Sequence, residues 1–177
     1  MLAGKRNTNQ LICVLAFLLG CAAACLTGYF CSAAAITGLK RYLSAWLDLN
    51  GDLCCLAGTV AFALFALLCS ASVFGFVLIP AANAFFGYCL TFSLIALWYE
   101  ETCTAAQLAL RIPSLLSVLP LLRISAMTMD ISCSISQLWR SNGIRSFDLH
   151  GINRQIWAAL FILFLLYELQ RFLDLII

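Results

Sequence analysis

Charged side chains are scarce in this chain. Lysine, arginine, aspartate and glutamate together make up 10% of its 177 residues, whereas 64% of the residues are hydrophobic. An average soluble domain contains about 25% charged residues, so this composition excludes an ordinary soluble fold. The basic residues are dispersed and the net charge is only +2, which excludes the basic patch typical of nucleic-acid-binding proteins. We therefore expect a protein that works in or beside a membrane.

Histidine is almost absent, which excludes the common metal-dependent hydrolases. A catalytic zinc site needs several converging ligands, and the chain has one histidine, His150. A membrane protease of the prenyl-processing kind would follow a glutamate pair with an arginine. Glu100 and Glu101 form such a pair, but Ala105 occupies the arginine position. We interpret the two glutamates as a water-facing helix end, and we predict no catalytic residue, no metal and no cofactor.

The cysteines show no metal-binding pattern either. No two of the ten have Cys-x-x-Cys spacing, and nine lie in apolar runs, where we interpret them as small hydrophobic side chains packed among helices. These nine are Cys13, Cys21, Cys25, Cys31, Cys54, Cys55, Cys69, Cys89 and Cys133. Cys103 lies in a polar connection and is the thiol expected to meet solvent.

Long apolar runs, by contrast, are abundant. A helix needs about 20 apolar residues to cross a bilayer, so we predict an all-α, polytopic integral membrane protein. It forms one domain over residues 1–177, with about five transmembrane helices. The predicted spans are residues 11–36, 53–79, 81–98, 120–139 and 157–177. We place the turn between the second and third spans at Pro80, because proline favours the first position of a helix.

Two connections between these spans are amphipathic, and they predict one or two interfacial helices at residues 39–49 and 100–117. In the first, apolar residues recur with i, i+3, i+4 spacing, and polar residues take the other side. Its Tyr42 and Trp46 suit the depth of the lipid headgroups. This helix either anchors the chain between two spans or presents a surface to a partner protein.

Small side chains mark places where helices can approach closely. Gly20, Ala24 and Gly28 recur every fourth residue and share one helix face, which favours close packing within the chain. Asn83 and Gly87 lie one turn apart on the third predicted span. We predict that another helix approaches there and that Asn83 forms an interhelical hydrogen bond.

The fourth predicted span carries a stripe of polar side chains, here called the polar seam: Arg123, Asp130, Ser134 and Gln137. Asp130 falls near the bilayer midplane, where an acid costs about 2.5–3.5 kcal/mol, whereas Arg123 can snorkel toward the membrane surface. These two residues lie about 10.5 Å apart along the helix axis, so the seam needs partners on other helices. It is a packing seam within the bundle, a docking seam for another subunit, or a substrate or ion site.

The C-terminal helix ends on charged residues. Glu168, Arg171 and Asp174 are spaced by three, so that neighbouring members can contact one another. This tail either leaves the bilayer or contacts a partner protein.

The basic residues are unevenly divided between the two sides of the predicted bundle. More of them fall on the side of the N-terminus, and the positive-inside rule makes that side cytoplasmic. We therefore predict a cytoplasmic N-terminus and an outer C-terminus. Both amphipathic connections then lie on the outer face.

Three apolar segments and their order carry a resemblance. They read FGFVLIPAANAFFGYCLTFSLIALW, LSVLPLLRISAMTMDISCSISQLWR and ALFILFLLYELQRFLDLII. Together with the amphipathic connections, over roughly residues 39–177, they resemble the stage II sporulation protein M family of endospore-forming bacteria. Ala84 and Gly87 only approximate the Gly-x-x-x-Gly-like contact that is usual in the hairpin of that family.

The resemblance implies a non-enzymatic scaffold in the bacterial cytoplasmic membrane. Such a scaffold holds peptidoglycan hydrolases at the septal membrane during sporulation engulfment, so the implied partners are membrane lipid and cell-wall hydrolases on the outer face. Under this interpretation Tyr42, Trp46, Glu168 and Arg171 are the expected partner contacts. The alternative is a substrate-binding subunit of a vitamin or metal uptake transporter, although such subunits usually have six spans.

Overall fold

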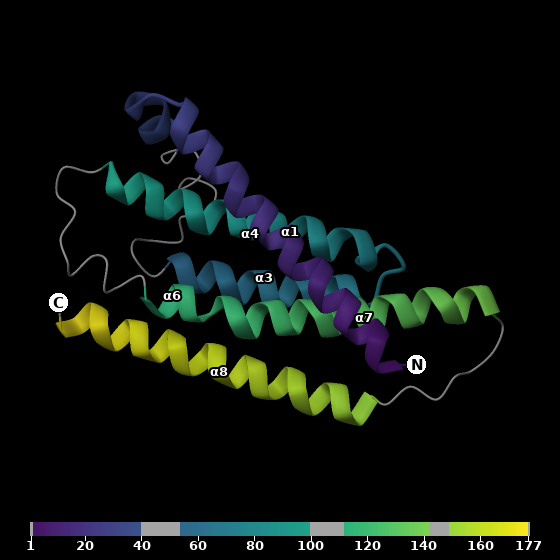
Figure 1. Cartoon of the computed structure of the whole chain (residues 1–177). Helices are drawn as coiled ribbons and strands as arrows, with labels where there is room; N and C mark the ends of the chain where they lie inside the picture. Colours follow the sequence, from purple (N-terminus) through teal and green to yellow (C-terminus); the bar gives the residue numbers. More distant parts are fainter. Residues whose placement is uncertain (1, 40–53, 100–111, 142–148, 177) are drawn as a thin grey trace.

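The fold is built from helices. The computed structural model describes residues 2–39, 54–99, 112–141 and 149–176, and every regular element within those ranges is helical (Figure 1). The labelled helices are α1 (Leu2–Phe30), α3 (Cys54–Ser70), α4 (Gly75–Trp98), α6 (Ile112–Leu116), α7 (Val118–Ser141) and α8 (Leu149–Ile176). Residues 33–39 form a further short helix. The predicted all-α class is confirmed for these residues.

Three helices in the described ranges are long and apolar enough to cross a membrane. The segments are Thr8–Phe30 of α1, Gly75–Trp98 of α4 and Val118–Gln137 of α7, while α3 contains the shorter apolar stretch Thr59–Ser70. They support a helical membrane protein. Five spans are not confirmed, and crossings by α3 and α8 stay predictions. The predicted interfacial helices fall largely on residues 40–53 and 100–111, which lie outside the described residues.

The first predicted span, residues 11–36, is broken before its apolar run ends. α1 stops at Phe30, and Ser32 precedes the short helix of residues 33–39, with its Oγ accepting a hydrogen bond from the Ala35 N–H at 3.4 Å. A serine that accepts from a nearby N–H favours the start of a new helix. The sequence stays apolar through the break because Ile36 is buried in a cluster shared with α1 and α4.

The predicted turn at Pro80 is wrong, because Pro80 lies inside α4. The chain turns instead at residues 71–74, where Ser72 Oγ accepts from the Phe74 N–H and Ser72 O accepts from the Gly75 N–H, both at 3.1 Å. Serine stabilises such turns through its side chain. Membrane helices tolerate a proline because their surroundings accommodate the backbone group that it frees, so Pro80 does not end the helix.

The bounds of α7 agree more closely with the predicted span than those of α8 do. α7 extends two residues beyond the predicted span, 120–139, at each end, and Pro120 lies in its first turn, where a backbone N–H has no helical partner. α8 begins at Leu149, ahead of the predicted residue 157. Its exposed Asn153 and Arg154 continue the helix beyond the apolar run.

The helices run lengthwise between two ends of the bundle (Figure 1). α1 crosses it diagonally and packs against α4 and α7, α3 packs against α4 and α7, and α8 packs against α6 and α7. The start of α1, the turn between α3 and α4, the end of α7 and the start of α8 gather at one end. The ends of α1, α4 and α8 and the short α6 gather at the other.

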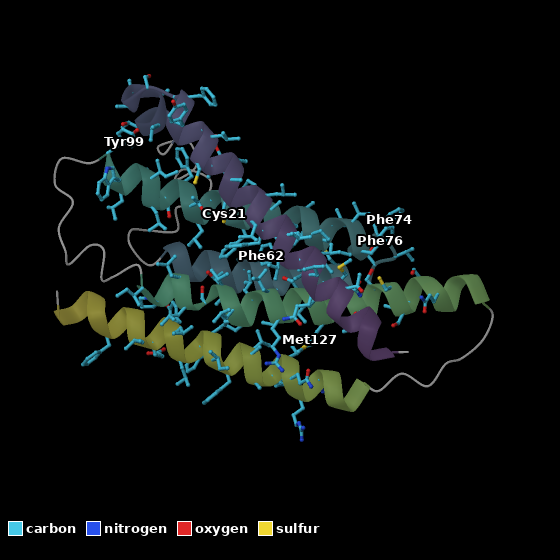
Figure 2. All side chains as sticks on the ribbon, in the orientation of Figure 1. Cys21, Phe62, Phe74, Phe76, Tyr99 and Met127 are labelled. Carbon is cyan, nitrogen blue, oxygen red and sulfur yellow. The ribbon has the colours of Figure 1, made fainter. Side chains whose placement is uncertain are left out.

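Apolar side chains fill the interior and also cover the outside. Buried clusters lie where α3, α7 and α8 meet, where α1, α3, α4 and α7 meet, and where α1, α4 and residues 33–39 meet. On α8 the exposed apolar residues include Trp157, Phe161, Phe164 and Phe172. Tyr99 lies at one end of the bundle, opposite Phe74 and Phe76 (Figure 2). An apolar outer surface of this kind suits contact with lipid.

Candidate functional site

α1 and α4 cross with their backbones in close approach. A Cβ atom added to Gly20 would lie 1.8 Å from the carbonyl oxygen of Ala84, and one added to Gly87 would lie 2.4 Å from the carbonyl oxygen of Phe17. At Gly28 the nearest atom would be Ile95 Cγ2, at 2.9 Å. Only glycine leaves room for backbones this close. The predicted small-residue face of α1 is confirmed as an intramolecular packing surface.

Asn83 links α4 to α7 inside the bundle. Its side chain is fully buried, and its Nδ2 donates to the Ile79 carbonyl at 2.9 Å. Its Oδ1 accepts from Ser125 Oγ of α7 at 3.2 Å. The predicted interhelical hydrogen bond is therefore confirmed. Its partner could not be predicted, because several serines on α7 have equivalent sequence signals.

A third link joins α1 to the polar seam of α7. Asn9 Nδ2 donates to Asp130 Oδ1 at 2.5 Å, and Asn9 is 5% exposed. Ser134 Oγ donates to the backbone carbonyl of Asp130 at 2.8 Å. Within the polar seam, Asp130 is therefore tied to α1 and Ser134 bonds to the backbone of its own helix, whereas Arg123 and Gln137 are exposed.

Asn9 is the partner that sequence reasoning missed. The first predicted span starts at residue 11, which leaves Asn9 in a polar stub, yet α1 already begins at Leu2. Asn9 lies four residues before Cys13 and eleven before Gly20, both buried. The signal that could have found it is this helical spacing, which places Asn9 on the buried face of α1.

The turn between α3 and α4 is also tied to α7. Ser132 Oγ donates to the Ser72 carbonyl at 2.6 Å. A Cβ added to Gly75 would lie 2.6 Å from Ser132 Oγ and closer still to the backbone carbonyl oxygen of Cys69. A side chain at position 75 would therefore clash with Ser132 and with the end of α3. Together, the three hydrogen-bonded links and the glycine crossing hold α1, α4 and α7 in one arrangement.

The predicted partner contacts are spread over different parts of the chain. Glu168 is exposed on α8. Arg171 also belongs to α8, but its side chain lies outside the described residues, as do Tyr42 and Trp46. Their role as partner contacts stays a prediction.

The residues described here contain no group of three histidine, cysteine, aspartate or glutamate side chains that could hold a metal ion. Comparison with protein families, curated proteins and solved structures finds no match. The site is therefore defined by its geometry: polar and small side chains that join helices across the interior.

Replacing Ser125 by alanine tests the link between α4 and α7. The change leaves Asn83 Oδ1 buried without this donor, and we expect a destabilisation of about 1 kcal/mol, typical of hydrogen bonds between membrane helices. Thermal unfolding in detergent, followed by size-exclusion chromatography, measures the effect. Ser93→Ala is the matched control, since Ser93 Oγ donates only to the Leu90 carbonyl of its own helix. Equal effects of the two changes would contradict the link.

Proposed function

We propose that this protein is a non-enzymatic membrane scaffold that recruits other proteins to the membrane. The observation that supports the proposal is that its buried polar side chains form hydrogen bonds between helices. Asn9 bonds to Asp130, Asn83 bonds to Ser125, and Ser132 bonds to the α3–α4 turn. These polar groups join helices to one another, as expected of a bundle that serves as a rigid platform.

The helix ends that flank the two predicted interfacial segments support a docking role at one end of the bundle. The end of the helix of residues 33–39, the start of α3, the end of α4 and the start of α6 all lie at the end of the bundle where α1 finishes (Figure 1). In the sequence, Tyr42 and Trp46 fall between residues 39 and 54. In our proposal this end is the outer face, and Tyr42, Trp46, Glu168 and Arg171 contact the partner.

The distribution of basic residues supports the same orientation. Lys5, Arg6 and Arg154 belong to helix starts at the opposite end of the bundle. Basic residues favour the cytoplasmic side. We therefore propose a cytoplasmic N-terminus, an outer C-terminus and the bacterial cytoplasmic membrane as the location.

The identity of the partners in this proposal rests on the resemblance to the stage II sporulation protein M family. It points to cell-wall hydrolases, held at the septal membrane during engulfment. We expect the tagged protein, purified from gently solubilised membranes of its host, to recover cell-wall hydrolases during starvation and not during growth, as read by mass spectrometry.

Two variants sharpen this measurement. Trp46→Ala removes a predicted partner contact, and we expect it to lower hydrolase recovery at least tenfold, which corresponds to about 1.4 kcal/mol of binding free energy. Leu19→Ala is the control, because Leu19 is an exposed apolar residue within the candidate span of α1. Recovery of ATP-binding transporter subunits from growing cells, or equal losses for both variants, would contradict the scaffold proposal.

A further inference from the structure

Sulfur-containing side chains from three helices meet inside the bundle. Cys13 of α1, Cys69 of α3 and Met129 of α7 are buried in one cluster, and Cys133 of α7 packs against it. Cys13 Sγ donates a hydrogen bond to Met129 Sδ at 3.9 Å. Cys13 and Met129 are 116 positions apart in the sequence, so cysteine spacing gives no sign of this cluster.

The distance between the two sulfur atoms suits a shared metal ion. If each sulfur lay about 2.3 Å from the ion, as in metal–thiolate bonds, a separation of 3.9 Å would give an S–metal–S angle of about 116°. That angle is close to trigonal and calls for a third ligand. Cys133 follows Met129 by one helical turn and thus shares its face of α7.

The chemistry of the cluster favours a soft, monovalent cation. Thiolate and thioether ligands select Cu(I) over hard cations. One thiolate and one Cu(I) ion carry no net charge together, which limits the cost of placing them among apolar side chains.

We propose that Cys13 and Met129, with Cys133 as the third sulfur, form a binding site for Cu(I). Binding replaces the proton of the Cys13 thiol, which passes to the solvent. The Met129 thioether binds without losing a proton and the Cys133 thiol keeps its proton, so the ion and its three ligands carry no net charge. No electron is transferred, because the metal enters as Cu(I). This site goes beyond the scaffold function and does not depend on it.

The test is an anaerobic titration of the purified, reduced protein in detergent with Cu(I), in competition with a chromogenic Cu(I) chelator. We expect one tightly held Cu(I) per chain and a raised unfolding temperature, because a ligand that binds the folded state stabilises it. Cys13→Ser should abolish the tight site, and Met129→Leu, which nearly conserves volume, should weaken it at least tenfold. Cys25→Ser is the control, since Cys25 is exposed on α1.

The variants separate binding from folding. Met129→Leu is expected to elute and unfold like the parent protein without copper, so its loss of affinity reports the missing thioether. Absence of a tight site in the parent protein would overturn the proposal. Equal losses for Cys13→Ser and Cys25→Ser would also overturn it, by showing that Cu(I) binds dispersed thiols.

Discussion

Replacing Gly20 by alanine is expected to give the largest loss of stability among alanine substitutions of the five glycines whose surroundings the structure describes. The new Cβ would lie 1.8 Å from the Ala84 carbonyl oxygen and 2.9 Å from the Tyr88 nitrogen, both backbone atoms. Backbone cannot rotate away as a side chain can, so α1 and α4 must separate. We expect a destabilisation of about 3 kcal/mol, the upper part of the usual range for overpacking. Thermal unfolding in detergent and the amount of folded protein in membranes both measure it.

Gly38→Ala is the matched control for that experiment. Gly38 also lies in a helix, and a Cβ added there meets no atom of the described residues within 4 Å. Alanine is more favourable than glycine in a helix by about 0.5–1 kcal/mol, so we expect no loss of stability. If Gly20→Ala and Gly38→Ala had the same effect, the close crossing of α1 and α4 would be contradicted.

Replacing Asp130 by leucine is expected to have the second-largest effect. The change leaves the buried Asn9 amide without its carboxylate acceptor, at a cost of about 1–3 kcal/mol. We expect less folded protein in membranes and a lower unfolding temperature. Unchanged abundance and stability would contradict the packing role of the polar seam.

A double-mutant cycle isolates the contact itself. Asn9→Leu and Asp130→Leu each leave one polar partner behind, whereas the double variant removes both and is expected to recover part of the lost stability. The coupling free energy should be about 1–2 kcal/mol, as for hydrogen bonds between model membrane helices. Ser134→Ala, whose hydroxyl bonds within α7, should change stability by less than about 0.5 kcal/mol. A coupling energy near zero would show that the two side chains act independently.

These predictions make α1 the element on which the arrangement of the bundle depends. It is held to α4 by glycine contacts and to α7 by the Asn9–Asp130 hydrogen bond. The contact at Gly20 depends on side-chain size, while the Asn9–Asp130 hydrogen bond depends on polar groups. Each of the two interactions can therefore be removed by substitution without removing the other. Recruitment of partners after Gly20→Ala and Asp130→Leu would report how far docking depends on the position of α1.

The errors of sequence reasoning have definite physical causes. Pro80 predicts the turn between α3 and α4 at the wrong place, because the side chain and carbonyl of Ser72 stabilise the actual turn. The predicted first span is too long because hydrophobicity does not distinguish one helix from two that share a core. The polarity of Asn9 places it outside the predicted span, although the buried face of α1 continues through it.

The sequence by itself predicted a membrane environment and an all-α fold for this protein. Composition excludes a soluble fold, apolar runs predict membrane helices, and the spacing of Gly20, Ala24 and Gly28 predicts a close helix contact. These are local properties, since each depends on residues within a few turns of one another. Only the tertiary structure decided which side chains meet, because that choice depends on the crossing and register of helices that are distant in the chain. Asn9 with Asp130 and Cys13 with Met129 are both products of where α1 crosses α7.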